Sequence, residues 1–257
     1  MLAELWAALQ SDWEVLALSS AAIFLAAIVR GFSGFGFSLL AITAISLILP
    51  VSQIVPSIFL LEIAASINLL PSIWREIHWS SLTWLMVGYV IGLPVGGYAL
   101  VHAPQAPAQL VLGIFVIGTA ILMLRGFNLA KTPGPSASTA TGAASGLLNG
   151  AFGIGGPPVV LFYFSTPGAA AIGRASIIFF FLFTDFLGVG YFATQGIATM
   201  QSFVQAAVWL PTLLIGVWLG AHGFRRMNQD AFRRWVLIIL IALAALGIGK
   251  AMMTLSQ

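Results

Sequence analysis

The sequence contains no cysteine and very little charge. Without cysteine, the chain has no disulfide framework, no thiolate metal site and no cysteine nucleophile. Charged residues make up 7% of its 257 residues and apolar residues 60%, whereas a soluble domain carries about 25% charged residues. Seven acidic and ten basic residues are too few to coat a soluble core of this size. The chain is therefore predicted to lie in a lipid bilayer.

Histidine is also scarce, and the basic residues form no nucleic-acid-binding patch. The three histidines, His78, His102 and His222, are widely separated, so no metal site and no cofactor are expected. The formal net charge is +3, but the basic residues are not interleaved with aromatic ones, so a nucleic-acid partner is not expected.

The apolar residues fall into ten hydrophobic segments. A membrane-spanning helix needs about 17–25 predominantly apolar residues. The segments cover approximately residues 13–29, 37–49, 51–74, 79–101, 107–124, 140–152, 159–165, 172–193, 200–224 and 232–252. Glycine-rich breaks over residues 30–36 and 153–158 separate the first segment from the second and the sixth from the seventh. We predict an all-α integral membrane protein with broken helices or re-entrant hairpins at these breaks.

The two halves of the sequence repeat one plan. The spacing of Gly31, Gly34 and Gly36 in the first half is the same as that of Gly150, Gly153 and Gly155 in the second. After these glycines come Glu62 and Trp84 in the first half, and Asp185 and Trp209 follow in the same order in the second. We predict a first repeat over residues 1–125, a linker over 126–139 and a second repeat over 140–257. Lys and Arg are concentrated in loops that face the cytoplasm. Their distribution predicts two repeats of opposite orientation, a cytoplasmic linker and two external termini.

Inverted repeats with interrupted helices are typical of secondary transporters, whose substrate sites lie near the membrane midplane. A helix that restarts inside the bilayer presents free N–H groups and the positive end of its dipole, which favour an anion. We therefore predict a substrate site between the two breaks. Its candidate residues are Arg30, Ser33, Gly34, Phe35, Gly36 and Phe37 at the first break and Asn149, Gly153, Ile154, Gly155 and Gly156 at the second.

Three charged residues are predicted to lie at membrane depth, where a charge costs about 2.5–3.5 kcal/mol or more. Arg30 could bind an anionic substrate or pair with Glu62 or Asp185. Glu62 and Asp185 are candidate coupling residues that could carry protons, because burial favours the neutral form of a carboxyl group. Alternatively, the acids are permanently ionised partners of Arg30, or Asp185 faces a water-filled vestibule.

The motif over residues 146–158 (GLLNGAFGIGGPP), together with residues 30–37 (RGFSGFGF), resembles the TauE/SafE family of membrane transporters. The resemblance covers essentially the whole chain. It implies export of sulfite or of a small organosulfonate such as sulfoacetate across the bacterial cytoplasmic (inner) membrane. The first motif keeps the glycines but lacks the Gly-Gly-Pro ending of the second.

Three classes of function remain open from the sequence. A secondary transporter working by alternating access explains the breaks and the midplane charges together. Such a transporter could use protons as its coupling ion and could form a homodimer. A transporter or channel for another small anion is the alternative, or a non-transporting scaffold, in which the paired interior acids would be hard to explain. An intramembrane serine protease would use Ser33, because Gly31-Phe32-Ser33-Gly34 fits a short G-x-S-G pattern, but it would need a histidine at the same depth.

Overall fold

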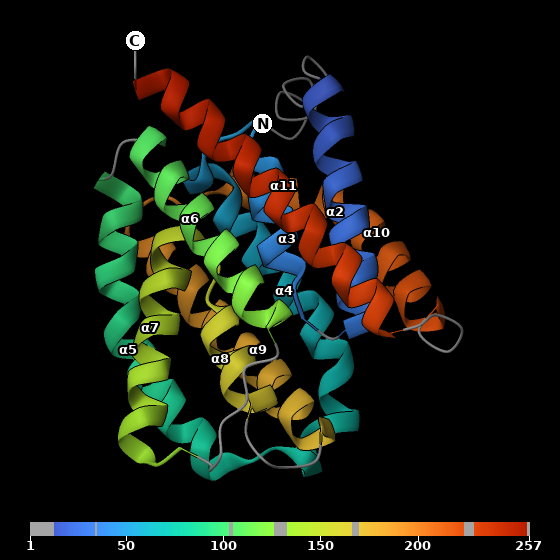
Figure 1. Ribbon diagram of the computed structural model, residues 1–257, viewed down its shortest axis with the longest axis vertical. Helices are drawn as coiled ribbons and strands as arrows, with labels where there is room; N and C mark the ends of the chain where they lie inside the picture. The colour runs from blue at the N-terminus through green and yellow to red at the C-terminus, as the bar shows by residue number, and fades with distance from the viewer. Residues whose placement is uncertain are drawn as a thin grey trace.

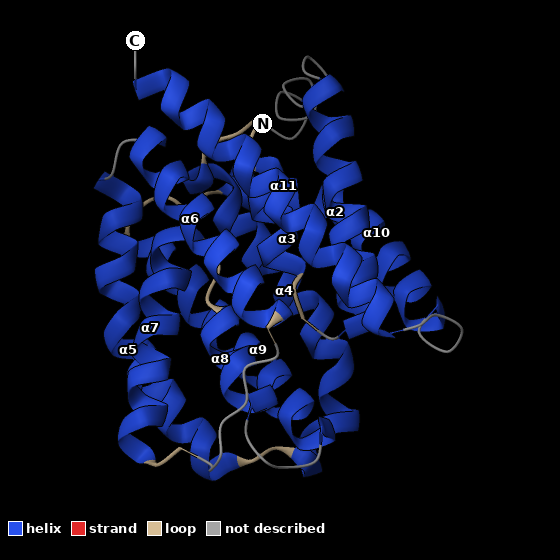
Figure 2. Cartoon of the chain, in the orientation of Figure 1, coloured by secondary structure: helices blue, strands red, loops and turns tan. Residues whose placement is uncertain are grey.

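The computed structural model describes residues 13–33, 35–102, 105–125, 133–165, 170–223 and 229–255. Within these ranges the chain forms ten α-helices and one 3-10 helix and has no strand (Figures 1 and 2). The elements are α2 (Trp13–Ser33), α3 (Phe37–Ile45), α4 (Val51–Ile73), η1 (Trp74–Glu76), α5 (Trp79–His102), α6 (Gln105–Leu124), α7 (Pro135–Phe152), α8 (Gly156–Ser165), α9 (Ala170–Thr194), α10 (Met200–Gly223) and α11 (Gln229–Leu255). The prediction of an all-helical chain is confirmed.

Helix lengths divide the elements into long helices and two half-length ones. Among the described residues, four stretches are long and apolar enough to cross a membrane: Trp13–Gly31, Trp79–His102, Ile172–Thr194 and Met200–Gly220. By contrast, α3 has 9 residues and α8 has 10. At about 1.5 Å per residue, each reaches only about half of a 30 Å hydrocarbon core. Helix α3 directly follows the first predicted glycine-rich break, and α8 begins within the second.

Several helix boundaries differ from the sequence prediction. Helix α2 continues to Ser33, into the predicted break over residues 30–36, and α3 ends at Ile45 rather than near residue 49. Helix α8 begins at Gly156 rather than Val159, so Pro157 and Pro158 lie inside its first turn. Proline is tolerated there because the first helical N–H groups have no intrahelical partner. Helix α7 begins at Pro135 rather than Ala140, so its small and hydroxyl-bearing first turns, which looked like linker in the sequence, are helical.

Helices α5 and α7 are in backbone contact, because glycines line both facing surfaces. A Cβ atom on Gly92 of α5 would overlap the carbonyl oxygen of Ala143 in α7. In the reverse direction, a Cβ on Gly146 of α7 would overlap the carbonyl oxygen of Tyr89 in α5. The same holds for the other glycines of the two stripes, which are Gly88, Gly96, Gly142 and Gly150. Small residues of this spacing allow close helix packing in membranes, so the glycines of α5 and α7 form a packing face.

The other principal helix pairs are α2 with α10, α4 with α9 and α6 with α11. In the α2–α10 pair, a Cβ on Gly216 would lie 2.6 Å from the Cβ of Ala27. Gly216 therefore also belongs to a packing face. The first turn of α2 and the last turn of α11 lie at the same end of the bundle, the upper end in Figure 1.

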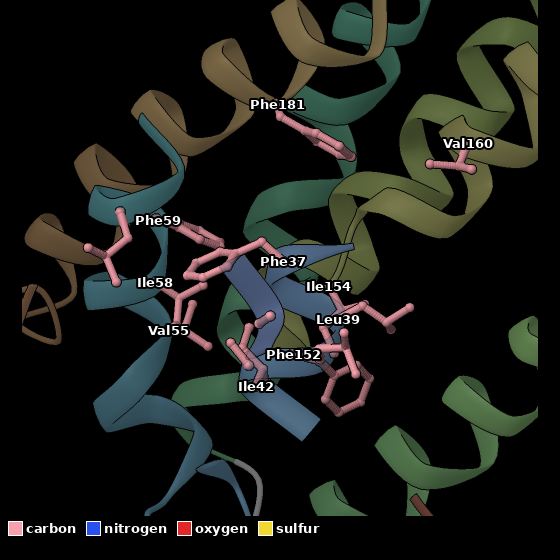
Figure 3. Packing of buried hydrophobic residues seen from close by; sticks show 14 of the residues in the cluster. Phe37, Leu39, Ile42, Val55, Ile58, Phe59, Phe152, Ile154, Val160 and Phe181 are labelled. Atoms are coloured by element: carbon pink, nitrogen blue, oxygen red, sulfur yellow. The ribbon is translucent and has the colours of Figure 1, made fainter. Parts of the chain in front are cut away.

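The half-length helices lie in the interior, whereas the long helices expose apolar side chains. Seven of the residues of α3 are buried, from Phe37 to Ile45, and Figure 3 shows Phe37 and Ile42 packed beside Val55 and Phe59 of α4. On α5, Val87, Ile91, Val95 and Tyr98 are exposed. An apolar surface of this kind is unfavourable in water and matches the hydrocarbon of a bilayer.

Candidate functional site

The first break is a short turn between α2 and α3. Helix α2 ends at Ser33, and Gly36 has the left-handed backbone conformation, with φ 88°, immediately before α3 begins at Phe37. Glycine adopts this conformation without the steric cost that a Cβ imposes. The Ser38 N–H in the first turn of α3 donates to Oε1 of Glu62 at 3.2 Å. The start of α3 therefore binds a carboxylate of the chain itself, as expected for the positive end of a helix dipole.

Arg30 and Glu62 form a buried ion pair behind this turn. Arg30 Nη1 donates to Glu62 Oε2 at 2.5 Å, and Arg30 Nη2 donates to Ser66 Oγ at 2.7 Å. The two charged side chains are 1% and 3% exposed. Of the alternatives that the sequence left open for Arg30, the structure shows pairing with Glu62. Arg30 Nε is buried and has no hydrogen-bond partner among the described residues, so one donor of the guanidinium remains unused.

The second break is organised by Asn149. Helix α7 ends with Gly153 in the left-handed conformation, with φ 70°, and the Gly153 N–H donates to the carbonyl oxygen of Asn149 at 2.8 Å. The Asn149 side chain accepts a hydrogen bond from the Gly155 N–H at 3.0 Å and donates to Tyr89 Oη at 2.8 Å. Ser145 Oγ also donates to the carbonyl oxygen of Gly155 at 2.6 Å. The turn over residues 153–155 is thus fixed to α7 and α5 by side chains.

The start of α8 offers fewer backbone donors than the start of α3. Pro157 and Pro158 have no N–H group, and the Gly155 N–H is already bonded to Asn149. Among the amides predicted to bind an anion at the second break, Gly156 is the first residue of α8 and precedes both prolines. The two breaks are therefore similar in backbone shape but different in hydrogen-bonding capacity.

Asp185 lies close to the ion pair but has no comparable partners. It is 4% exposed, and its Oδ2 atom is buried without a hydrogen-bond partner among the described residues. The charges of Glu62 and Arg30 both act on it, because α9, which carries Asp185, packs against α4, which carries Glu62. Tyr89 on α5 is also within electrostatic range of Asp185, and its hydroxyl donates to the carbonyl oxygen of Thr184 at 2.9 Å.

The structure thus brings together the charged residues that the sequence singled out. Arg30, Glu62 and Asp185 lie in one buried region, and Asn149 is linked to it through Tyr89. Among the glycine-break candidates, Phe37 and Ile154 are fully buried, whereas Phe35, Gly36 and Gly156 are half-buried. Gly34 lies outside the described residues, and Ser33 is described only as the last residue of α2.

Sequence reasoning missed several partners of these side chains, namely Ser66, Tyr89 and Ser145. Ser66 follows Glu62 by four positions and Ser145 precedes Asn149 by four, so each pair lies on one helix face, a signal that could have found them. Tyr89 lies between Gly88 and Gly92 in an apolar stretch and carries no comparable signal.

The histidines give no support to a protease. His78 Nδ1 is 2.8 Å from Ser81 Oγ, and the exposed His102 bonds through Nδ1 to the Tyr98 carbonyl of its own helix. The side chain of His222 lies outside the described residues. In the part of the chain that the structure describes, no group of histidine and acidic residues could hold a metal ion.

Comparison with known proteins identifies the family. The family model described as sulfite exporter TauE/SafE matches residues 19–246. A protein of Cupriavidus necator named "Probable sulfite/organosulfonate exporter TauE" is 28% identical over 221 residues, which cover 84% of this chain and 86% of the relative. No solved structure matches the chain. The match to the family model includes both glycine breaks, Arg30, Glu62, Asn149 and Asp185. The chain belongs to the TauE/SafE family, and it is a multi-pass membrane transporter rather than an enzyme.

Proposed function

We propose that the protein exports a small sulfur-containing anion, sulfite or an organosulfonate such as sulfoacetate, across the bacterial cytoplasmic membrane. Family membership supports the substrate class. The observation that carries the mechanism is the placement of two glycine turns, each followed by a buried half-length helix, around one cluster of charged side chains. Broken helices at membrane depth are tolerated where they line a cavity or are buried in protein.

The substrate site lies between the two breaks. Arg30 supplies its unused Nε donor and positive charge, Asn149 supplies a side-chain amide, and backbone amides near Gly36, Phe37 and Gly156 supply further donors. Burial strengthens these interactions, since a buried hydrogen bond to an anion does not compete with water. The substrate binds in competition with Glu62, which already occupies the start of α3 in this conformation.

The transporter works by alternating access of two inverted repeats. Helix packing supports this arrangement. When α2 to α6 are matched in order with α7 to α11, the α5–α7 contact corresponds to the α10–α2 contact, and the α4–α9 and α6–α11 contacts correspond to themselves. A pseudo-two-fold relation would produce this pattern. We place the first repeat over residues 1–125 and the second over 140–257, with both termini outside and a cytoplasmic linker over 126–139, of which residues 135–139 form the start of α7.

The main helix contacts also indicate which bodies move. Since α5 packs on α7 and α2 packs on α10, each close pair contains one helix from each repeat. The glycine stripes of α5 and α7 leave no space for sliding by a fraction of a turn, because backbone meets backbone. We infer that the α5–α7 pair moves as one body relative to the α2–α10 pair.

Counterflow in liposomes tests the proposed function. Purified protein is reconstituted into vesicles loaded with unlabelled sulfite or sulfoacetate, and uptake of the labelled anion is followed. We expect counterflow with a sulfur oxyanion and little with acetate or phosphate, and protein-free vesicles are the control. Absence of counterflow with every sulfur oxyanion would contradict the substrate assignment, and counterflow with another small anion instead would favour the alternative transporter.

A further inference from the structure

The acids Glu62 and Asp185 occupy matching places in the two halves but have opposite surroundings. Glu62 has two partners, the Arg30 guanidinium and the Ser38 N–H, and Arg30 is held in turn by the Ser66 hydroxyl oxygen, to which its Nη2 donates. Asp185 has Oδ2 buried and unpartnered. Because both acids are almost fully buried, at 3% and 4% exposure, solvent does not compensate for the difference. The cause lies in the sequence around the two acids.

The two partners of Glu62, and the Ser66 hydroxyl that holds Arg30, are each replaced in the second half by a residue that cannot take their place. Arg30 precedes Gly31, and the neutral Asn149 precedes the matching Gly150. Ser38 follows Gly36 by two positions, and the corresponding residue after Gly155 is Pro157, which has no N–H to donate. Ser66 follows Glu62 by four positions, whereas Val189 follows Asp185 by four. The cation, the amide donor and the hydroxyl are therefore all absent at the matching positions of the second half.

No donor among the described residues forms a hydrogen bond with Asp185 Oδ2. The single hydroxyl hydrogen of Tyr89 is donated to the Thr184 carbonyl. Both terminal nitrogens of Arg30 donate elsewhere, to Glu62 and to Ser66. The charge of Arg30 is also balanced by that of Glu62, so an ionised Asp185 would leave a net negative charge in the buried cluster. An isolated carboxylate in such surroundings is neutralised by a proton rather than kept ionised.

Among the described residues, no other group on the elements that pack against α9 brings a positive charge into the buried cluster. α4 contributes Glu62, α7 has no titratable residue, and α8 contributes Tyr163, whose hydroxyl is 3.0 Å from Ser81 Oγ. Besides Tyr89, α5 carries Tyr98 and His102, which are exposed and stack on each other. On η1, Arg75 and Glu76 are exposed, as is Arg174 on α9 itself.

We propose that Asp185 is the proton-binding site of the transporter and is neutral in this conformation, whereas Glu62 is the fixed partner of Arg30. This inference deepens the proposed function and rests on it. A proton adds to a carboxylate oxygen of Asp185, and no other bond changes. Arg30 Nε and Asp185 Oδ2 are both buried without partners, so the two groups do not meet here. A movement that joins them, or admits water, releases the proton.

Transport driven by a pH gradient tests the assignment. Vesicles with the membrane potential clamped near zero are given a gradient of one pH unit. With one proton coupled to each anion, wild-type protein should build an anion gradient of about tenfold, since one pH unit and a tenfold concentration ratio store equal free energy. Asp185→Asn should retain counterflow, because the amide imitates the neutral acid, and should lose the gradient-driven accumulation. Glu76→Gln, which removes an exposed acid, is the matched control.

The outcomes separate this inference from the proposed function. If wild-type protein shows no counterflow, the proposed function fails. If wild-type protein shows counterflow but no response to the pH gradient, or if Asp185→Asn responds as wild type does, the proton site is wrong. Loss of counterflow in a folded Asp185→Asn protein would also overturn the assignment.

Infrared spectroscopy gives a readout that does not depend on transport. The chain has three aspartates, Asp12, Asp185 and Asp230, so isotope labelling of aspartate isolates a small set of carboxyl groups. We expect wild-type protein at neutral pH to show the carbonyl band of a protonated aspartate, shifted by the label. Absence of that band would refute a neutral Asp185, and its survival in Asp185→Asn would assign it to another aspartate.

Discussion

Replacing Glu62 by glutamine removes the negative charge of a buried ion pair and leaves the positive charge of Arg30 uncompensated. The Arg30 side chain is 1% exposed, so the guanidinium cannot turn to water without opening the helix packing. Breaking a buried pair from one side costs about 3–5 kcal/mol, because the remaining charge is uncompensated. We expect Glu62→Gln to lower the free energy of unfolding by that amount.

A double replacement separates the ion pair from the other contacts of the two residues. In Arg30→Met with Glu62→Gln, both charges are absent, and replacing a buried pair by uncharged side chains is often nearly neutral for stability. The double variant should therefore be more stable than Glu62→Gln alone. The assay is the free energy of unfolding in mixed micelles with a denaturing detergent, and Glu76→Gln, at an exposed position, should stay within about 0.5 kcal/mol of wild type. If the double variant is destabilised by the sum of the two single changes, the residues are not coupled and the reasoning is refuted.

Three further predictions concern the glycines and Asn149. Gly92→Ala should destabilise the protein by about 1–3 kcal/mol, because its Cβ would overlap the α7 backbone. Gly118→Ala should be neutral or stabilising, because nothing lies within 4 Å of its new Cβ. Equal unfolding midpoints for the two variants would contradict backbone contact between α5 and α7. Gly153 and Gly196 both have a left-handed backbone, in which an alanine costs about 1–2 kcal/mol. Only a Cβ at Gly153 would meet other atoms, Ile42 Cδ1 at 2.6 Å and Val55 Cγ2 at 2.8 Å. The unfolding midpoint of Gly153→Ala should therefore fall further than that of Gly196→Ala. Asn149→Ala removes the hydrogen bonds to the Gly155 N–H and to Tyr89. It should weaken anion binding about 10-fold or more, because a hydrogen bond to a charged group contributes about 1.5–3 kcal/mol. Unchanged affinity in calorimetry would exclude Asn149 from the site, and Thr83→Ala at an exposed position is the control.

The breaks and the helix order could be predicted from the sequence because glycine and proline act locally. Gly36 and Gly153 have the positive φ angles that only glycine adopts easily, and each ends or precedes a helix where the sequence indicated it. The start of α8 was misplaced because Pro157 and Pro158 were interpreted as breakers, although proline fits a first helical turn.

Long-range partners could not be predicted in the same way. The glycine spacing of α5 indicates a packing face, but it does not say that α7 covers it, because any small-residue face would fit. Trp84 and Trp209 match in sequence order, yet Trp84 is 44% exposed and Trp209 is 1% exposed. Likewise the sequence placed Glu62 and Asp185 at equivalent depth, but which of them pairs with Arg30 depends on the side chains that meet across helices.

The pairing of α2 with α10 and of α5 with α7 has a consequence for how the chain is made. A ribosome delivers α2 to the membrane long before α10 has been synthesised, and α5 must wait for α7 before its glycine stripe is covered. The first half therefore cannot reach its final packing during its own insertion. A nascent chain stalled after α6 would leave that stripe open to any small-residue helix nearby, which makes this stage of biogenesis the one most exposed to mispairing and to quality-control proteases.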